Sequence, residues 1–341
     1  NTKVVNIEVE EKPTGEITIG AGVGSEGGTL GFSVTENNFL GKGIKLGTSL
    51  RLTDDSVKGS FTVVNPNFNY SNKTLSTTVE STNIDKLTDN GYETTKTGFS
   101  VGTGFEQYEN TYFRPTLSTY FEDLTTNSKA SANLKKQSGS YFDTKLNYNI
   151  DFDNRNQKFQ TSEGNRFVFA QGIPLISDEY SLRNTVEYQT WKKFNNEVVT
   201  NMSLYGTMIN SLKDEDVRIT DRISLPRKRL KGFQYGAIGP VDAGDYVGGN
   251  YATVMNFTSS LPMILTTVEN IDVKYFLDVA NLWGVDYSSS IDDSNKIRSS
   301  TGIGVDWFTP IGPMTFSIAQ DLSKADTDKT ESFQFNLGTT F

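Results

Sequence analysis

Apolar and polar residues alternate one by one through much of this chain, and the pattern is clearest in the last eleven residues. Every second position of residues 331–341 can face one side of an extended strand: Phe333, Phe335, Leu337, Thr339 and Phe341. The positions between them, including Gly338, are small or polar. A strand with lipid on one face and a water-filled lumen on the other has this pattern. The segment therefore predicts the closing strand of a transmembrane β-barrel.

Similar alternation recurs in segments of about ten residues, separated by turn sequences such as Gly41-Lys-Gly43 and Asn65-Pro66-Asn67. These segments lie within residues 15–24, 30–34, 44–52, 99–105, 113–121, 142–150, 182–190, 198–208, 251–257, 271–279, 303–307 and 314–318. Strands of this length, with loops of similar mean length, give about 16 strands in 341 residues. We therefore predict an all-β fold, a transmembrane antiparallel β-barrel of about 16 strands.

Strand parity predicts which side chains face lipid and which face the lumen. Ile303 and Phe316 belong to the lipid face, and their neighbours Gly304 and Ser317 belong to the lumen. The same parity turns Asp278 and Lys274 inward. Three tryptophans lie near strand ends, where the interfacial aromatic girdles of such barrels occur: Trp191, Trp283 and Trp307.

One interval, residues 209–250, has no amphipathic strand pattern. It contains charged residues, prolines and glycines instead, as in Pro226-Arg-Lys-Arg229 and Gly239-Pro240. Structureless stretches of this length are usually functional or disordered. The aromatic residues and glycines within it favour an ordered loop that folds into the barrel lumen.

Composition narrows the possible chemistry. The 341 residues include neither cysteine nor histidine, so a thiol nucleophile, a thiolate metal site and the commonest general base are all missing. We predict no enzyme activity, no catalytic residue, no metal and no cofactor, with an all-carboxylate site as the remaining alternative. The net charge of −9 disfavours nucleic acid as a partner. No apolar run approaches the roughly 18 residues of a membrane helix, which leaves strands to span a bilayer.

An ordered set of motifs in the second half of the chain resembles a known family. The set comprises Leu230-Lys231-Gly232-Phe233, Gly239-Pro240, Gly248-Gly249-Asn250, Phe276-Leu-Asp278, Trp307-Phe-Thr-Pro-Ile-Gly-Pro313 and Phe333-Gln-Phe-Asn-Leu-Gly338. With these residues the chain resembles the barrel of the BamA-type outer-membrane insertases, whose mitochondrial relatives are the sorting-and-assembly pores. The resemblance implies that residues 13–341 form the barrel. It also implies that residues 1–12 are the last strand of a truncated periplasmic POTRA domain, with the other POTRA repeats missing.

The resemblance assigns a role to the loop motif. Lys231 stands where the family has an arginine that pairs with acidic groups on the inner wall of the barrel. Asp278 matches one of these groups, and Thr258 occupies the position of the other. The alternatives are an ordinary glycine turn at Gly232 and an Asp278 bonded to a wall residue such as Lys274.

The two ends of the barrel predict a weak seam. Glycine packs no side chain against a neighbouring strand, and the first strand is rich in it: Gly15, Gly20, Gly22 and Gly24. Its partner is the closing strand, with Phe333, Phe335, Leu337, Gly338 and Phe341. By resemblance, the seam would open in the bacterial outer membrane and template unfolded outer-membrane proteins that carry a C-terminal strand signal. Accessory assembly lipoproteins would bind through the missing POTRA domains, and the lipid bilayer would contact the barrel wall.

A channel that secretes or translocates a polypeptide through the lumen is the alternative function within the same superfamily. A porin is a more distant third possibility, because the long loop would fill the pore.

Overall fold

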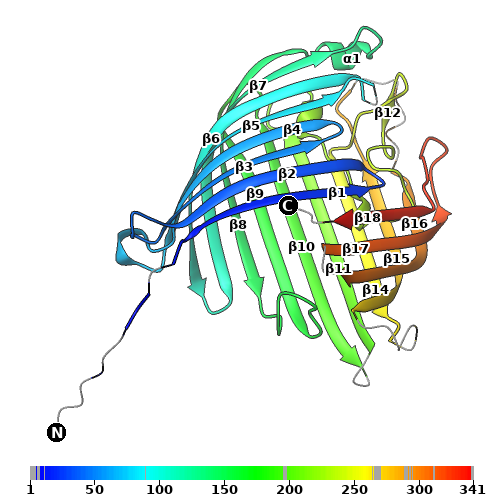
Figure 1. The fold of residues 1–341 in the computed structure, drawn as a ribbon. Helices are drawn as coiled ribbons and strands as arrows, with labels where there is room; N and C mark the ends of the chain where they lie inside the picture. The colour runs from blue at the N-terminus through cyan, green and yellow to red at the C-terminus, as the bar shows by residue number, and fades with distance from the viewer. Residues whose placement is uncertain are drawn as a thin grey trace.

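Sixteen strands of the chain close into one antiparallel barrel in the computed structural model (Figure 1). The structure describes residues 5, 8–10, 12–88, 90–194, 198–262, 264, 270–287, 291, 293, 295–309 and 312–338. Strands that follow one another in the sequence are neighbours in the barrel, and β1 meets β18 to complete the ring. The prediction of an all-β barrel of about 16 strands is confirmed.

The strands are longest in the middle of the chain and shortest at its ends. Their bounds are β1 (Gly15–Gly24), β2 (Gly27–Phe39), β3 (Ile44–Thr53), β4 (Ser56–Asn65), β5 (Thr74–Lys86), β6 (Tyr92–Tyr108), β7 (Thr111–Thr126), β8 (Gly139–Asp153), β9 (Gly164–Ser177), β10 (Ser181–Phe194), β11 (Val198–Ser211), β14 (Tyr251–Ser260), β15 (Ile271–Trp283), β16 (Ile297–Thr309), β17 (Gly312–Ser323) and β18 (Phe333–Gly338). Two short helices, η1 (Phe68–Tyr70) and α1 (Ala132–Lys135), lie in connections between strands. Among the described residues, we find no helix of the length and apolar character needed to cross a membrane.

Side chains alternate between the two faces of the wall, as the sequence pattern predicts. On β17, Ile318 points outward with 66% of its surface exposed, whereas the adjacent Ala319 is buried inside. On β16, Ile303 is likewise exposed on the outer face, and Gly304 lines the interior together with Ser317. The outer face is therefore apolar where a bilayer would contact it.

Trp307 lies on the outer face of β16 near the strand end, as expected for an interfacial girdle. The same expectation for Trp191 is wrong, because this side chain lines the interior of the barrel. On β10 the outer positions are the even ones, with Val186 and Tyr188 exposed. An odd-numbered residue such as Trp191 therefore faces the lumen.

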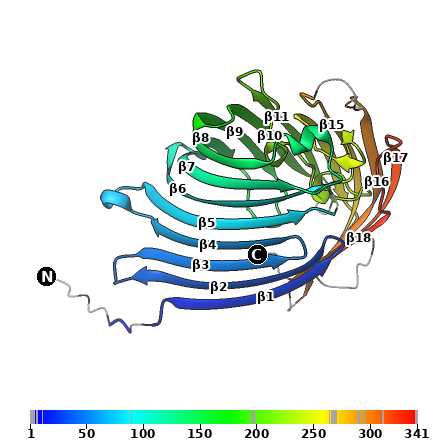
Figure 2. The ribbon, with the colours of Figure 1, turned by 90° about the horizontal axis from the view of Figure 1, so that it is seen from above.

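The connection between β11 and β14 folds into the barrel, and Figure 2 shows it within the outline of the wall. We call residues 212–250 the lumen loop. It contains η2 (Ile219–Asp221), η3 (Arg227–Arg229) and a hairpin of β12 (Val241–Asp242) and β13 (Asp245–Tyr246). The predicted inward-folded loop is confirmed, but it starts at residue 212 rather than 209. The reason is that β11 stays paired with β10 as far as Ser211.

The lumen loop and one part of the wall share a hydrophobic cluster, which we call the lumen core. The loop contributes Val217, Ile223, Leu225, Leu230, Phe233 and Ile238, and the wall contributes Ile209, Ala252, Val254, Ala280 and Leu282. Burying apolar side chains stabilises a fold by roughly 25 cal/mol per Å² removed from water. The loop is therefore a packed part of the molecule, and it fixes the position of the polar residues on either side of the core.

The start of β1 and the end of β18 lie on the same side of the barrel, which we call the terminal side; the lumen loop enters from the opposite, loop side. Residues 8–10 lie away from the barrel wall, on the terminal side (Figure 1). Residues 5, 8–10 and 12 form no strand, and Val5 and Val9 are exposed. The other residues of 1–12 lie outside the described part, so their assignment to a POTRA strand stays a prediction.

Candidate functional site at the barrel seam

The seam between β1 and β18 has the shortest ladder of the described barrel. Three residue pairs join the two strands: Gly22 with Gly338, Val23 with Leu337, and Gly24 with Asn336. By comparison, the ladder between β16 and β17 runs from Ser299–Ser323 to Thr309–Gly312, with one register shift at Ser299–Ser300. The seam pairs lie at the loop-side end of β1, so residues 15–21 have no described partner on this edge. An unpaired strand edge exposes backbone donors and acceptors.

Two of the glycines at the seam are required by close backbone contact. Gly338 has a φ of +105°, and a Cβ there would lie 2.4 Å from the carbonyl oxygen of Ala21. A Cβ at Gly24 would lie 2.8 Å from the carbonyl oxygen of Phe335. Both distances are too short for a side chain. These glycines therefore let the two backbones approach, while they add no side-chain contact to hold the seam.

The other predicted seam residues lie at different positions. Gly15 and Gly20 pair with Glu36 and Gly31 of β2, and no described β18 residue lies opposite them. Phe333 and Phe335 precede the three ladder pairs in the chain, and their rings stack on each other with centroids 6.0 Å apart. Phe341 lies outside the described residues.

The closing strand is less firmly held than its sequence pattern predicts. Residues 333–341 alternate throughout, yet β18 pairs with β17 only from Phe333–Ile318 to Leu337–Met314. The described ladder does not extend to Leu322. Before Phe333 the chain turns inward, where Thr330 bridges to Phe233 of the lumen loop. The carbonyl of Ser332 still accepts from the N–H of Ala319 on β17 at 2.8 Å, but Glu331 and Lys329 bond to the lumen loop.

A cavity of about 950 Å³ lies behind the seam. At the seam its lining includes both the inward-facing Gln334 and the outward-facing Phe335. Deeper inside, it is bordered by Lys231 and Trp191. The cavity therefore connects the edge of the seam with the docked part of the lumen loop.

The structure brings Lys231 and Asp278 together on the inner wall. The Nζ of Lys231 donates to Oδ2 of Asp278 at 3.0 Å, and the backbone N–H of Lys231 donates to the same oxygen at 3.1 Å. Asn256 donates to Oδ1 of Asp278 at 2.7 Å. Asp278 has no exposed surface. Its two oxygens are therefore compensated by three donors, as a buried carboxylate requires.

The rest of the motif also contacts the wall. Gly232 has a φ of +84°, and a Cβ there would lie 2.9 Å from the Cβ of Ala319, so only glycine fits this docked turn. Gln334 of β18 donates to the carbonyl of Phe233 at 2.9 Å. Leu230 and Phe233 belong to the lumen core. The loop tip is thus attached both to the wall and to the closing strand.

Lys274, the alternative partner of Asp278, forms an ion pair with a different carboxylate. Lys274 donates to Oδ2 of Asp306 at 2.7 Å, across β15 and β16. Thr258, the expected second wall residue, lies opposite Phe276 in the ladder, whereas Asn256 lies opposite Asp278. Asn256 therefore occupies the position next to the carboxylate, and Thr258 lines the cavity.

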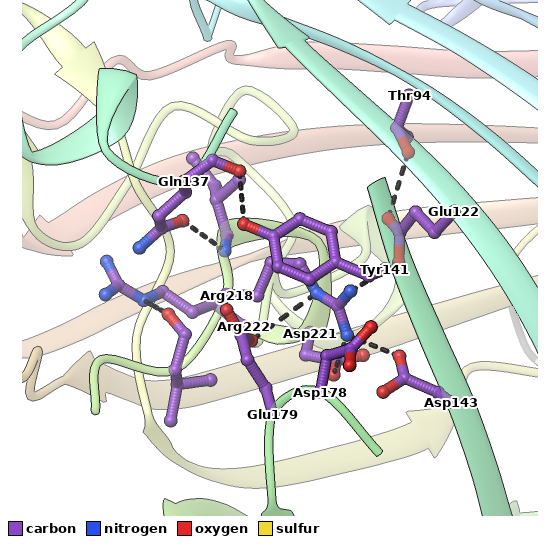
Figure 3. Close-up of polar contacts among 12 residues, drawn as sticks. Thr94, Glu122, Gln137, Tyr141, Asp143, Asp178, Glu179, Arg218, Asp221 and Arg222 are labelled. Carbon is purple, nitrogen blue, oxygen red and sulfur yellow. Dashed lines mark hydrogen bonds and ion pairs between the residues drawn. The ribbon is translucent and has the colours of Figure 1, made fainter. Parts of the chain in front are cut away.

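A buried charge cluster at the base of the lumen loop was not predicted (Figure 3). Arg218 has no exposed surface, and four carboxylates surround its guanidinium. The N–O distances are 2.5 Å to Asp143, 3.4 Å to Glu122, 3.5 Å to Glu179 and 3.6 Å to Asp221. The cluster joins the loop to β7, to β8 and to the β9–β10 turn.

Burial raises the pKa of Glu179 to about 7, against the attraction of Arg218, and the nearby Asp221 and Asp143 raise it further. Asp221 behaves in the opposite way. Its burial opposes ionisation, but Lys145, Lys96 and Arg218 hold its pKa below the ordinary value. Within the part of the chain that the structure describes, no acidic group is arranged to hold a metal ion. The cluster is therefore a contact between loop and wall in which the pKa of Glu179 is raised and that of Asp221 is lowered.

The sequence offered little signal for the charged contacts of the loop. Arg218 and Glu122 are 96 positions apart, and both look like ordinary polar residues in their own segments. Arg229, which donates to Glu187 of β10 at 3.0 Å, was recognised only as part of a basic run. Such pairs depend on how a loop crosses the lumen, which periodicity does not describe.

Comparison with known proteins agrees with this geometry. The family model described as the Omp85 superfamily domain matches residues 38–341. An outer membrane protein assembly factor BamA from Neorickettsia risticii (strain Illinois) is 23% identical over 357 residues, covering 99% of this chain and 46% of the relative. A sorting and assembly machinery component 50 homolog from Mus musculus is 27% identical over 189 residues, covering 52% of this chain and 40% of the relative. The chain thus spans less than half the length of these curated relatives.

A solved structure has the same fold. The crystal structure of BamA from Haemophilus ducreyi lacking POTRA domains 1–3 matches with a TM-score of 0.90 and 23% identity. The match covers 97% of this chain and 71% of the solved chain. The barrel fold is therefore one already seen in a solved protein.

Proposed function

Since this chain belongs to the Omp85 superfamily, we propose that it folds and inserts β-barrel proteins into the bacterial outer membrane through the seam between β1 and β18. Its relatives, an outer membrane protein assembly factor and a sorting and assembly machinery component, support this proposal. The observation that carries it is the three-pair ladder of the seam.

The physical basis is strand addition to an exposed edge. In a bilayer, each unpaired backbone donor or acceptor is costly. Within the part of the chain that the structure describes, residues 15–21 of β1 have no partner on the seam side, and we infer that they present such an edge. An incoming strand that pairs with this edge satisfies its own backbone and that of β1 at once. Insertion by this route needs no catalytic residue, metal or cofactor.

The substrates would be unfolded outer-membrane proteins that present a C-terminal strand. Accessory assembly lipoproteins would act through POTRA domains outside residues 13–341. The bilayer would contact the apolar outer face, where side chains such as Ile318 and Phe333 are exposed. The seam opening, and not the lumen, is the route that we assign to the substrate. The lumen loop and its core lie inside the barrel, which disfavours a polypeptide channel through its centre.

A disulfide across the seam tests the proposal. Val23 and Leu337 lie directly opposite each other, and antiparallel partners have Cα atoms about 4.5–5.5 Å apart, within the range of a disulfide. We expect the Val23→Cys/Leu337→Cys barrel to remain folded when oxidised but to lose insertion of substrate barrels into liposomes. Reduction should restore insertion. The chain has no cysteine of its own, so background thiols do not interfere.

The matched control is Ile303→Cys/Ile318→Cys, a pair that lies opposite in the longer β16–β17 ladder. Oxidation of this pair should leave insertion unchanged. Full insertion by a barrel with a completely oxidised seam would contradict the proposal and favour a route through the lumen.

A further inference from the structure

Arg227 of the lumen loop reaches both sides of the seam. Its Nε lies 3.1 Å from Oε1 of Glu26, and its Nη2 donates to the carbonyl of Ser25 at 3.0 Å. Both partners belong to the turn between β1 and β2. On the other side, Nη1 of Arg227 pairs with Glu331, two residues before β18. One side chain therefore joins the two strands that the short ladder holds together.

The β18 side of this contact is already fastened to the lumen loop. The backbone N–H of Glu331 donates to the carbonyl of Gly232 at 2.9 Å, and that of Gln234 donates to the carbonyl of Lys329 at 3.0 Å. The loop and the segment before β18 therefore behave as one unit. On the β1 side, the described hydrogen bonds and ion pairs between the loop and residues 15–27 are those of Arg227.

The seam ladder continues for one step beyond Gly24, next to Arg227. The backbone N–H of Ser25 donates to the carbonyl of Phe335 at 3.0 Å, and its Oγ accepts from the N–H of Phe335 at 3.1 Å. The carbonyl of the same Ser25 is held by Arg227. Arg227 therefore orients the residue at which the seam ends on the loop side.

We propose that Arg227, with Ser25, Glu26 and Glu331, is a latch that keeps the seam closed while the lumen loop is docked. Its role in substrate insertion rests on the function proposed above, but its effect on the seam does not. Without Arg227, the described contacts that hold β1 against β18 would be the three ladder pairs and those of Ser25.

The two carboxylates that pair with Arg227 are exposed enough to solvent for the latch to open. The side chain of Arg227 is only 14% exposed, but those of Glu26 and Glu331 are 52% and 32% exposed. Water and salt reach such carboxylates, and salt screens exposed charges over distances of about 8–10 Å. A fully buried pair would be much harder to separate, because each charge would be left without a partner.

Arg229 provides a matched control two residues further along η3. It donates to Glu187 of β10 at 3.0 Å, and its guanidinium lies 3.6 Å from the centre of the Tyr205 ring. Arg229 therefore attaches the same short helix to the wall at β10 and β11, away from the seam. Replacing either arginine removes one cation from η3, but only Arg227 touches the seam.

The test measures seam opening directly. Spin labels on cysteines introduced at Phe32 of β2 and Ile318 of β17, both exposed on the outer face, would report the distance across the seam for the full chain in lipid nanodiscs. We expect Arg227→Ala to raise the ratio of open to closed seams by roughly tenfold or more, as loss of hydrogen bonds to charged groups implies. Arg229→Ala should leave the distance distribution unchanged, and 1 M salt should open the unmodified latch.

Glu26→Gln and Glu331→Gln keep the arginine and test each side of the latch separately, with smaller expected shifts. Heat-dependent gel mobility would verify that each variant is folded.

An unchanged distance distribution in folded Arg227→Ala, or an equal shift in Arg229→Ala, would overturn the latch. A shifted distribution with unchanged substrate insertion would leave the latch standing and count against the seam as the insertion route. If the disulfide-locked seam loses insertion but Arg227→Ala does not shift the distance distribution, the latch proposal fails and the proposed function stands.

Discussion

Asp278 illustrates how single residues hold the lumen loop in place. It is a carboxylate with no exposed surface, held by the ammonium and backbone N–H of Lys231 and by the amide of Asn256. Breaking a buried ion pair by removal of one partner typically costs about 3–5 kcal/mol, because the remaining charge is left uncompensated. The backbone and amide donors that remain here would reduce that cost.

A double-mutant cycle measures this pair. We expect Lys231→Ala and Asp278→Asn each to destabilise the docked loop, and their effects to be non-additive by about 1–3 kcal/mol. The measurement is the protease sensitivity of residues 212–250 at increasing denaturant concentration. The cycle Lys274→Ala with Asp306→Asn, a wall pair that does not touch the loop, should leave loop cleavage unchanged. Additive effects at Lys231 and Asp278 would show that the two side chains do not act together.

The Lys231–Asp278 contact could be anticipated from the sequence only through the family resemblance. Parity turns Asp278 inward but does not identify the group that faces it. Nor did the sequence identify Asn256 as its neighbour, because the position opposite Asp278 depends on the register between β14 and β15. A shift of two residues keeps the same face of the strand and changes the partner. Periodicity therefore predicts the face but not the contact.

Glu179 predicts how stability depends on pH. Its pKa is raised in the folded protein, so the folded state holds this proton more tightly than the unfolded chain does. The resulting stabilisation is complete below pH 4.5 and is lost as the pH rises to about 7. Glu179→Gln cannot ionise, so its Tm should fall less than that of the unmodified protein between pH 5 and pH 8.

Thermal unfolding in detergent micelles at both pH values would measure this difference. The exposed Glu109 in the β6–β7 turn serves as the control, since Glu109→Gln should not change the pH dependence. An identical pH profile for Glu179→Gln and the unmodified protein would contradict the assignment.

At the scale of elements, alternation predicted most strands but did not identify β4, β5 and β9. In β5, threonine and serine occur on both faces, so apolar and polar positions do not separate. In β9, Gly172 and Pro174 interrupt the pattern, and its register with β8 shifts at Thr144–Lys145. These three strands entered the prediction only through the total of about 16 strands, which was estimated from the chain length. Where lipid and lumen faces have similar composition, hydrogen bonding to neighbouring strands decides the structure.

An arginine scan tests the two faces of a single strand. Ile318→Arg places a charge on the outer face of β17 and should destabilise the barrel by about 2–4 kcal/mol near mid-membrane. Ser317→Arg, one residue earlier, points into the 950 Å³ cavity and should cost much less. The measurement is reversible unfolding by guanidinium in phospholipid vesicles. Equal costs at both positions would be inconsistent with a membrane-spanning β17.

At the scale of the whole molecule, the barrel is held unevenly around its circumference. The ladder between β6 and β7 runs from Tyr92–Thr126 to Tyr108–Thr111, whereas the seam has three pairs. Local opening is expected where backbone hydrogen bonds are fewest. The overall barrel and a weak seam could be predicted from the sequence, but the length of each ladder could not, since it depends on where the paired residues end.

Hydrogen exchange should reveal the uneven ladder lengths. In lipid nanodiscs, we expect the amides of residues 15–21 and 333–338 to exchange at least about tenfold faster than those in the middle of β6 and β7. Oxidation of Val23→Cys/Leu337→Cys should slow exchange near the seam without affecting β6. Uniform protection around the barrel would contradict a weak seam.

The lumen loop also has a consequence for how this protein itself folds. Its core side chains pack on β11, β14 and β15, elements close to it in sequence, whereas the seam joins residues more than 300 positions apart. Contacts between distant parts of a chain form slowly, because a long loop must first be closed. We therefore expect the loop to dock onto this part of the wall early, while the cylinder is still an open sheet. Closure of β1 on β18 would then be the last folding step, and it would enclose a loop that is already in place.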